Sequence, residues 1–185
     1  MKKTLLIFFQ FYIFLAFAQE SEFTLSKDGL TDYIVTECKG KTQSEIYRKT
    51  LNWISVIYNT PSAVLKGNIE NEYIRIEGSS KDMFALNFFG KDFCSATYQI
   101  EISFKDGKYK FDIIELKYFN EEAFPGPTWK EFNLNNASIY YSKRGRISNV
   151  FKYLPDTLPQ YLNNLNSSLK NFVMSDNIPS KREGW

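Results

Sequence analysis

Two segments of alternating apolar and polar residues, joined by Asp106-Gly107, constrain the fold of this chain most strongly. Asp-Gly is a favoured two-residue turn between antiparallel strands. With this turn, three apolar pairs lie opposite one another on one face: Phe104 and Tyr109, Ile102 and Phe111, Ile100 and Ile113. A slip of one residue would set apolar against polar side chains, so the register is well specified. The sequence therefore predicts an antiparallel sheet with one buried and one solvated face.

Further short apolar runs, most of them bounded by turn-forming residues, extend this sheet. The expected strands are Leu30–Cys38, Val64–Asn68, Glu72–Gly78, Met83–Phe89, Thr97–Phe104 and Tyr109–Tyr118, with a short one at Ile139–Tyr141. The stretch from Glu121 to Leu134 contains Pro125-Gly126-Pro127 and has no steady period, which indicates a loop.

Two helices are predicted. Thr42 and Glu45 form a capping box before an amphipathic segment that ends at Pro61, and Trp53 lies on its apolar stripe, which favours a place in the core. Near the C-terminus, leucines at helical spacing between Leu158 and Leu169 form a second apolar stripe. Its polar residues are expected to face water: Asn163, Asn164, Asn166, Ser167 and Lys170. The fold class is therefore α+β, an antiparallel sheet packed against one central helix and a C-terminal helix.

The N-terminus has the pattern of an export signal. Lys2 and Lys3 precede an apolar run from Leu5 to Phe17, and Ala16-Phe17-Ala18 supplies a small-x-small cleavage site. The run is shorter than the roughly 20 apolar residues of a membrane span. We expect a signal peptide over residues 1–18, cleaved near Ala18-Gln19, and a periplasmic or extracellular protein with no further transmembrane segment. The remainder is expected to form one domain over residues 19–175, with a loop excursion over 119–146 and a flexible tail over 176–185.

Charge and composition weigh against several classes of protein. Without Lys2 and Lys3, the 23 basic residues become 21, which balance 21 acidic ones. Nucleic-acid-binding proteins normally carry a basic excess, so no nucleic-acid partner is expected. The chain has no histidine, which removes the usual general base and the commonest zinc ligand. No cofactor-binding fingerprint is present, and we expect no cofactor, no metal site and no catalytic residues.

The two cysteines, Cys38 and Cys94, leave two alternatives open. An oxidising destination would permit a disulfide between them. Both also lie within apolar, strand-like stretches, where a buried thiol packs as a small hydrophobic side chain.

Several segments in this order resemble a family of exported bacterial domains of unknown function with a TATA-binding-protein-like (TBP-like) fold. The segments are Gly40 after a strand, Ser44-Glu45-Ile46-Tyr47, Asn52-Trp53-Ile54, Asp106-Gly107-Lys108-Tyr109-Lys110 and the helix Leu162–Leu169. The resemblance covers roughly Phe23 to Val173. It implies the fold and a location in the envelope of Gram-negative bacteria, and it implies no functional residues and no DNA binding.

Aromatic side chains are the most suggestive candidates for binding. Five of them lie in or beside the proline-containing loop: Tyr118, Phe119, Phe124, Trp129 and Phe132. Such a loop either covers a sheet edge or forms a patch for an envelope protein, a peptide or a glycan. We therefore expect a non-catalytic binding or structural module of the cell envelope.

Two alternatives remain open at this point. A small hydrolase would need convergent carboxylates, with Glu101, Asp112, Glu121 and Glu122 as its candidates. A β-augmentation module would instead pair an exposed strand edge with a strand of its partner.

Overall fold

The computed structural model describes residues 22–121 and 125–175. The expected signal peptide and the expected flexible tail lie outside the described residues. The strands are β1 (Leu25–Ser26), β2 (Gly29–Leu30), β3 (Tyr33–Glu37), β4 (Leu65–Ile69), β5 (Tyr73–Leu86), β6 (Asp92–Lys105), β7 (Lys108–Asn120) and β8 (Thr128–Glu131). The helices are α1 (Gln43–Ile57), α2 (Pro61–Val64) and α3 (Leu154–Met174), with 3-10 turns η1 (Ala137–Ile139) and η2 (Asn149–Phe151).

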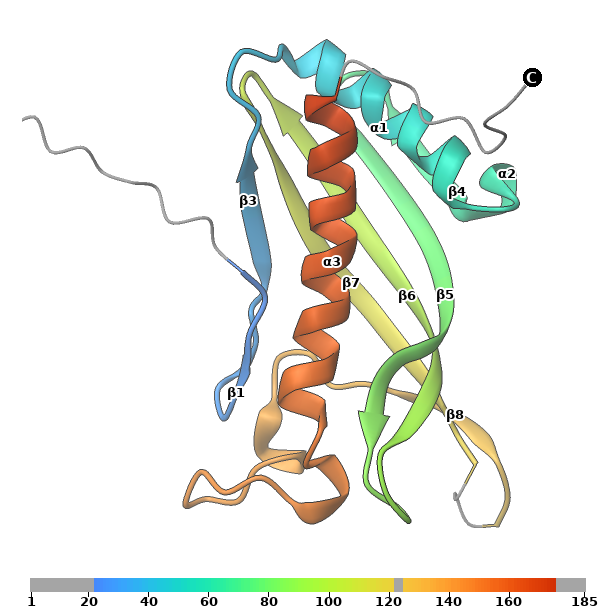
Figure 1. Ribbon diagram of the computed structural model, residues 1–185, viewed down its shortest axis with the longest axis vertical. Coiled ribbons are helices and arrows are strands. Elements are labelled where there is room, and N and C mark those ends of the chain that lie inside the picture. Colours follow the sequence, from blue (N-terminus) through green and yellow to red (C-terminus); the bar gives the residue numbers. More distant parts are fainter. Residues whose placement is uncertain (1–21, 122–124, 176–185) are drawn as a thin grey trace, which may run out of the picture.

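One six-stranded antiparallel sheet forms the main layer. Its order is β3-β7-β6-β5-β4, and β8 pairs with the end of β7 beyond β3. Figure 1 shows α3 running along one face of this sheet, with α1 beside it near one end. The predicted α+β arrangement of a sheet, a central helix and a C-terminal helix is confirmed. We call the face beneath the helices the inner face and the opposite one the outer face.

The predicted hairpin register is confirmed. Its three apolar pairs are Phe104 with Tyr109, Ile102 with Phe111, and Ile100 with Ile113, and all six side chains are buried. The pairing shifts by one residue between Gln99 and Ile100. A bulge of this kind inserts one residue into a strand and bends it.

Strand β5 is longer than the sequence indicated. The segments Glu72–Gly78 and Met83–Phe89 were expected as separate strands, but most of each belongs to β5, which pairs with β6 over nearly its whole length. The last three residues of the second segment, Asn87–Phe89, lie in the turn before β6. The pairing is interrupted only by a register shift between Ser80 and Phe84. The polar residues between the two segments therefore form an irregularity within one strand rather than a turn.

The capping box of α1 is confirmed. Thr42 Oγ1 accepts from the amide of Glu45 (3.3 Å), and a Glu45 carboxylate oxygen accepts from the amide of Thr42 (2.8 Å). This last hydrogen bond is the main reason that the pKa of Glu45 lies below its ordinary value. Local chemistry thus sets the first residue of the helix.

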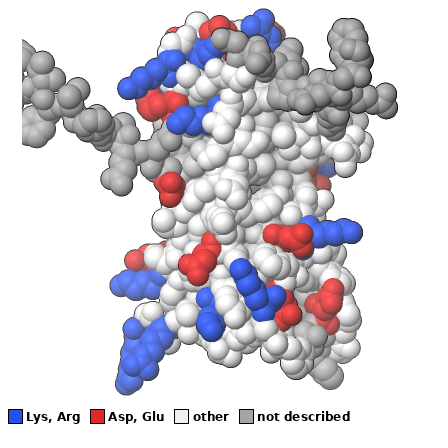
Figure 2. Space-filling model, in the orientation of Figure 1, with Lys and Arg blue, Asp and Glu red and all other residues white. Residues whose placement is uncertain are grey.

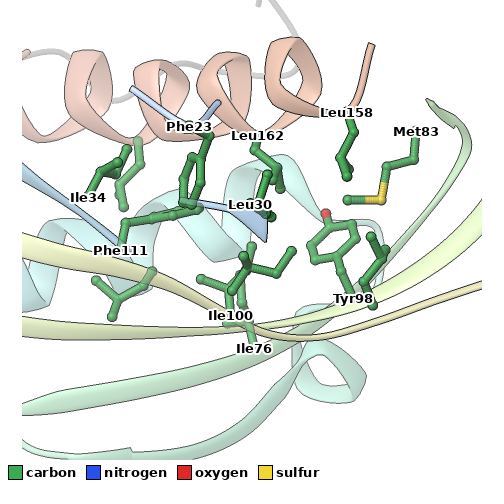
Figure 3. Packing of buried hydrophobic residues seen from close by; sticks show 14 of the residues in the cluster. Phe23, Leu30, Ile34, Ile76, Met83, Tyr98, Ile100, Phe111, Leu158 and Leu162 are labelled. Carbon is green, nitrogen blue, oxygen red and sulfur yellow. The ribbon is translucent and has the colours of Figure 1, made fainter. Parts of the chain in front are cut away.

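A single hydrophobic core fills the space between the inner face and the helices (Figure 3). Leu158 and Leu162 of α3 face Ile76, Ile100 and other apolar side chains of the strands. Trp53 of α1 has no exposed surface, so the expectation that it belongs to the core is confirmed. Figure 2 shows that charged side chains gather toward the two ends of the helix-covered face.

One polar residue of α3 is buried, contrary to the prediction that it faces water. Asn166 is 8 % exposed and lies against β3 and β7. Its Oδ1 accepts from Tyr109 Oη (2.8 Å), and its Nδ2 donates to Thr36 Oγ1 (3.0 Å). Burial of an amide is tolerated because its hydrogen bonds are made within the protein.

Two segments after β7 also differ from the prediction. Thr128–Glu131, expected within a loop excursion, forms β8 because its backbone pairs with Lys117–Asn120 of β7. Ile139–Tyr141, expected as a strand, instead ends a 3-10 turn, and only Tyr141 makes an isolated bridge, with Ile147.

The alternative of a disulfide between Cys38 and Cys94 is wrong. Cys38 donates its backbone N–H to Gly107 O (2.7 Å), beside the hairpin turn that follows β6. Cys94 lies near the other end of β6, about 35 Å away at the rise of an extended strand. A disulfide needs Cα atoms within about 7 Å. Both cysteines are buried thiols.

Candidate functional site

The outer face carries polar and charged side chains along most of its length. Tyr73 Oη donates to Glu101 Oε1 (2.6 Å), and Arg75 Nη2 donates to the same oxygen (2.6 Å). The hydrogen bond from Tyr73, followed by that from Arg75, lowers the pKa of Glu101. Glu101 is therefore held as a carboxylate.

The carboxylates proposed for a hydrolase do not form an acid–base pair of the usual kind. Glu101 and Asp112 are opposite each other in β6 and β7, but Asp112 is bound by its own cation, Lys110 Nζ (2.8 Å). A general acid needs a raised pKa, and that of Glu101 is lowered. Glu121 is exposed at the end of β7, and Glu122 lies outside the described residues.

The five candidate aromatic residues fall into different environments. Tyr118 and Phe132 are buried, and both rings pack against Phe84, with centroids at 5.6 and 5.9 Å. They belong to the core, so the prediction that they bind a partner is wrong for these two residues. Phe124 lies outside the described residues. Phe119 and Trp129 remain as candidates.

Phe119 and Trp129 lie on the outer face at the end where β8 joins the sheet. They are direct partners across β7 and β8, and their ring centroids are 5.5 Å apart. Trp129 is 49 % exposed. Phe119 also lines a shallow hollow of about 150 Å³ with Phe89 and Phe93, which are 93 % and 51 % exposed. We call Phe89, Phe93, Phe119 and Trp129 the outer aromatic cluster.

Strand alternation explains why these rings point outward. Successive side chains of a strand lie on opposite faces. Cys94 and Tyr118 are buried on the inner face, so their neighbours Phe93 and Phe119 lie on the outer one. Phe89 and Phe93 were not among the predicted binding residues, because the pattern of their segment did not indicate the start of β6 and its preceding turn.

A larger cavity, of about 610 Å³, lies where the end of α1 meets β5, β6 and α3. Three tyrosines lie along it. Tyr98 Oη is 3.1 Å from Tyr58 Oη and accepts from Tyr161 Oη at 3.4 Å. Burial raises the pKa of Tyr58 to about 12, and it also raises the pKa of Tyr98, so both hydroxyls are protonated at neutral pH. We call this space the tyrosine cavity.

Gly78 creates room for the central tyrosine of this cavity. It lies directly opposite Tyr98 in the sheet, and a Cβ at position 78 would be only 2.4 Å from Tyr98 Cζ. We expect Gly78→Ala to lower the free energy of unfolding by about 1–3 kcal/mol, because the ring must shift within a packed core. Urea denaturation of the purified protein measures this change.

Gly67→Ala is the matched control, since a Cβ at Gly67 in β4 would meet nothing within 4 Å. It should leave the stability unchanged or raise it slightly. Equal stabilities for the two variants would show that the packing of the Tyr98 ring does not require a glycine at position 78.

The described residues contain neither a metal cluster nor a helix that could span a membrane. In residues 22–121 and 125–175, no three Cys, Asp or Glu side chains are grouped so that they could hold a metal ion. None of the helices in the described part of the chain has the length and hydropathy needed to cross a bilayer.

Part of the chain is similar to a known family of domains. Residues 33–119 match the family model described as "Domain of unknown function (DUF4468) with TBP-like fold". The crystal structure of a DUF4468 family protein from Bacteroides ovatus ATCC 8483 superposes with a TM-score of 0.60 at 11 % identity, covering 84 % of this chain and 91 % of that one. A TBP-like protein from Parabacteroides distasonis ATCC 8503 gives a TM-score of 0.53 at 14 % identity, covering 76 % and 90 %. No curated protein matches the chain. At these identities the structural likeness concerns the fold alone.

Proposed function

Because residues 33–119 match the DUF4468 family model and the chain shares the TBP-like fold, a fold that carries no activity by itself, we propose a function from the surface of this chain. We propose that it is an exported, non-catalytic binding module of the cell envelope, which binds a protein partner through the outer aromatic cluster. The observation that carries this proposal is the exposure of large aromatic side chains side by side at one end of the sheet.

The composition of the outer aromatic cluster supports a protein partner. Aromatic side chains contribute a large share of the energy of protein–protein interfaces, especially at their centre. Trp129 and Phe93 each leave about half of their surface in solvent, and Phe119 lies in contact with both the Trp129 ring and the hollow. Lys91 Nζ lies 5.3 Å from the centre of the Phe93 ring and adds a polar rim.

The export half of the proposal is supported by the N-terminal pattern of Lys2-Lys3, an apolar run and Ala16-Phe17-Ala18. The non-catalytic half is supported by the lack of histidine in the sequence and by the lowered pKa of Glu101. A hydrolase that used Glu101 and Asp112 would have to overcome the cations that already bind both carboxylates.

A β-augmentation module is the second candidate. β8 already pairs with Lys117–Asn120, so it takes up the edge of β7 beside the outer aromatic cluster. An added strand would therefore have to pair with the short strand β8 or with another edge of the sheet. The outer aromatic cluster offers a partner side chains rather than backbone groups.

A capture experiment with matched variants tests the proposed function. Tagged protein without residues 1–18 is incubated with envelope extract of the producing organism, and retained proteins are quantified by mass spectrometry. We expect a specific partner whose recovery falls at least tenfold for the double variant Phe119→Ala/Trp129→Ala, because aromatic residues of an interface centre contribute strongly to affinity.

Tyr33→Ala is the control. Tyr33 is 50 % exposed on β3, opposite Asp112 of β7, which is seven residues along the strand from Phe119. It therefore matches Trp129 in exposure but lies outside the cluster. Recovery that is the same for the double variant and the wild type, or that falls equally for Tyr33→Ala, would refute docking through the cluster.

A further inference from the structure

The tyrosine cavity is separate from the outer aromatic cluster, and its hydroxyl groups define what it can bind. Tyr58 lies at the end of α1, Tyr98 on β6 and Tyr161 on α3, so three elements distant in sequence bring their hydroxyls together. Apolar side chains such as Ile57, Val64 and Leu165 line the same space. The cavity therefore combines apolar walls with a small set of convergent polar groups, as ligand sites do.

One proton of the three tyrosine hydroxyls is not used in the hydrogen bonds among them and can be donated to a ligand. Each hydroxyl carries one proton, and the two contacts among them, at 3.1 and 3.4 Å, use two of the three. Tyr161 donates to Tyr98, so the remaining proton belongs to Tyr58 or Tyr98, depending on which of these two donates to the other. Within the described residues no other acceptor is bound to it. The cluster can thus donate one hydrogen bond into the cavity and can also accept there.

The charged groups of the cavity compensate each other. Among the described residues, its lining contains one cation and one carboxylate, Lys66 and Glu77, and Lys66 Nζ lies 3.2 Å from Glu77 Oε1. Gln99 Nε2 also donates to Glu77 (3.2 Å). A charged ligand would have to compete with this ion pair, whereas a neutral one would not.

The backbone of Ser79 adds a donor and an acceptor. Phe104 N–H donates to Glu72 O (3.1 Å), so even-numbered residues of β6 bond to even-numbered residues of β5. The N–H and C=O groups of odd-numbered residues of β5 point away from β6. Those of Ser79 therefore point to the edge of the sheet. β4 pairs with β5 only as far as Ile76, so in the described part of the chain this edge lies open beside the cavity.

The length of this edge favours a compact ligand over a peptide strand. The free edge runs only from Glu77 to Ser80, where the register of β5 shifts. An added strand would meet only two outward-facing residues, Glu77 and Ser79, whereas β-augmentation depends on several main-chain bonds.

We propose that the tyrosine cavity binds a neutral, hydroxyl-rich small molecule, of the class of an uncharged saccharide unit. Such a ligand presents hydroxyls that both donate and accept, which match the tyrosine hydroxyls and the Ser79 backbone, and carbon-bound hydrogens that match the aromatic and aliphatic walls. It carries no charge that would disturb the pair of Lys66 and Glu77.

Two-dimensional NMR titration tests this inference. Glucose, N-acetylglucosamine, cellobiose and N,N′-diacetylchitobiose are the neutral probes, and glucuronate and glucosamine are their charged counterparts. We expect at least one neutral probe to shift the Ser79 amide and the neighbouring signals of the cavity. The charged counterparts should bind at least tenfold more weakly.

Three variants locate the site. Tyr58→Phe should weaken binding about tenfold, because it removes a hydrogen-bonding hydroxyl and leaves the ring in place. Ala63→Trp, at an exposed position in the cavity lining, should abolish binding by filling the space. Tyr73→Phe removes a hydrogen-bonded hydroxyl on the outer face and should leave binding unchanged.

Other outcomes overturn the inference. It is wrong if no neutral probe shifts the cavity signals, if charged and neutral sugars bind equally, or if Ala63→Trp binds as the wild type does. Because Phe119 and Trp129 do not line this cavity, their double variant should bind sugars normally, which keeps this test independent of the proposed function.

Discussion

Trp53→Ala should lower the free energy of unfolding by about 3–5 kcal/mol, the range for deletion of a fully buried large aromatic side chain. Trp53 has no exposed surface, and its indole Nε1 donates to Ser168 Oγ of α3 (3.1 Å). The ring also packs edge-on against Tyr58, with centroids 5.9 Å apart. Its loss would leave a cavity between α1 and α3. Equilibrium unfolding in urea measures the change.

Ser168→Ala serves as the control for this substitution, because it removes the hydrogen bond and keeps the indole. We expect it to cost only about 0.5–1.5 kcal/mol. If both variants were equally stable, the Trp53 ring would contribute little packing between α1 and α3.

Asn166→Leu should cost about 2–4 kcal/mol, although leucine is apolar, has a similar volume and favours helices. The substitution takes the side-chain amide away from the buried Thr36 hydroxyl. It also removes the shorter of two hydrogen bonds that Tyr109 Oη donates, while the longer one, to the backbone oxygen of residue 166 (3.2 Å), remains. A lost hydrogen bond costs about 0.5–1.5 kcal/mol. Each buried polar group left without a partner costs about 1–3 kcal/mol. Thermal or urea unfolding of the purified variant checks the value.

Asn164→Leu is the matched control on the same helix. Asn164 is exposed two residues away, so its replacement should change the stability by no more than about 0.5 kcal/mol. A stable Asn166→Leu variant would mean that Tyr109 and Thr36 find other partners and that the buried network is not required.

The parts of the fold that were predicted correctly depend on local chemistry. The Asp106-Gly107 turn sets the register of β6 and β7 through neighbouring residues, and the box of Thr42 and Glu45 sets the start of α1. Both signals lie within a few residues of the feature that they determine. They could therefore be recognised without knowledge of the rest of the chain.

The parts that were missed depend on contacts between distant segments. β8 exists because Thr128–Glu131 pairs with the end of β7, and an irregular, proline-bounded segment gives no periodic sign of such pairing. Asn166 was predicted to face water because its side chain is polar. Its spacing, four residues after Leu162 and three before Leu169, in fact places it on the buried stripe of α3.

The candidate binding residues, too, were predicted only where a local signal in the sequence indicates them. Phe119 and Trp129 were found because aromatic residues are conspicuous in a proline-containing loop, but Tyr118 and Phe132 were assigned to the same patch. Only the alternation of β7, after its bulge, separates Tyr118 on the inner face from Phe119 on the outer one. The three tyrosines of the cavity come from α1, β6 and α3, so their meeting could not be read from spacing along the chain.

Hydrogen–deuterium exchange on the complex with the captured partner tests the central claim most directly. If the chain docks through the outer aromatic cluster, amides of the turn and strand around Phe89 and Phe93 and of Thr128–Glu131 should be protected on binding. Those of α1 and β3 should exchange as in the unbound protein. Protection confined to β3 or the helices, with the cluster unchanged, would contradict the account.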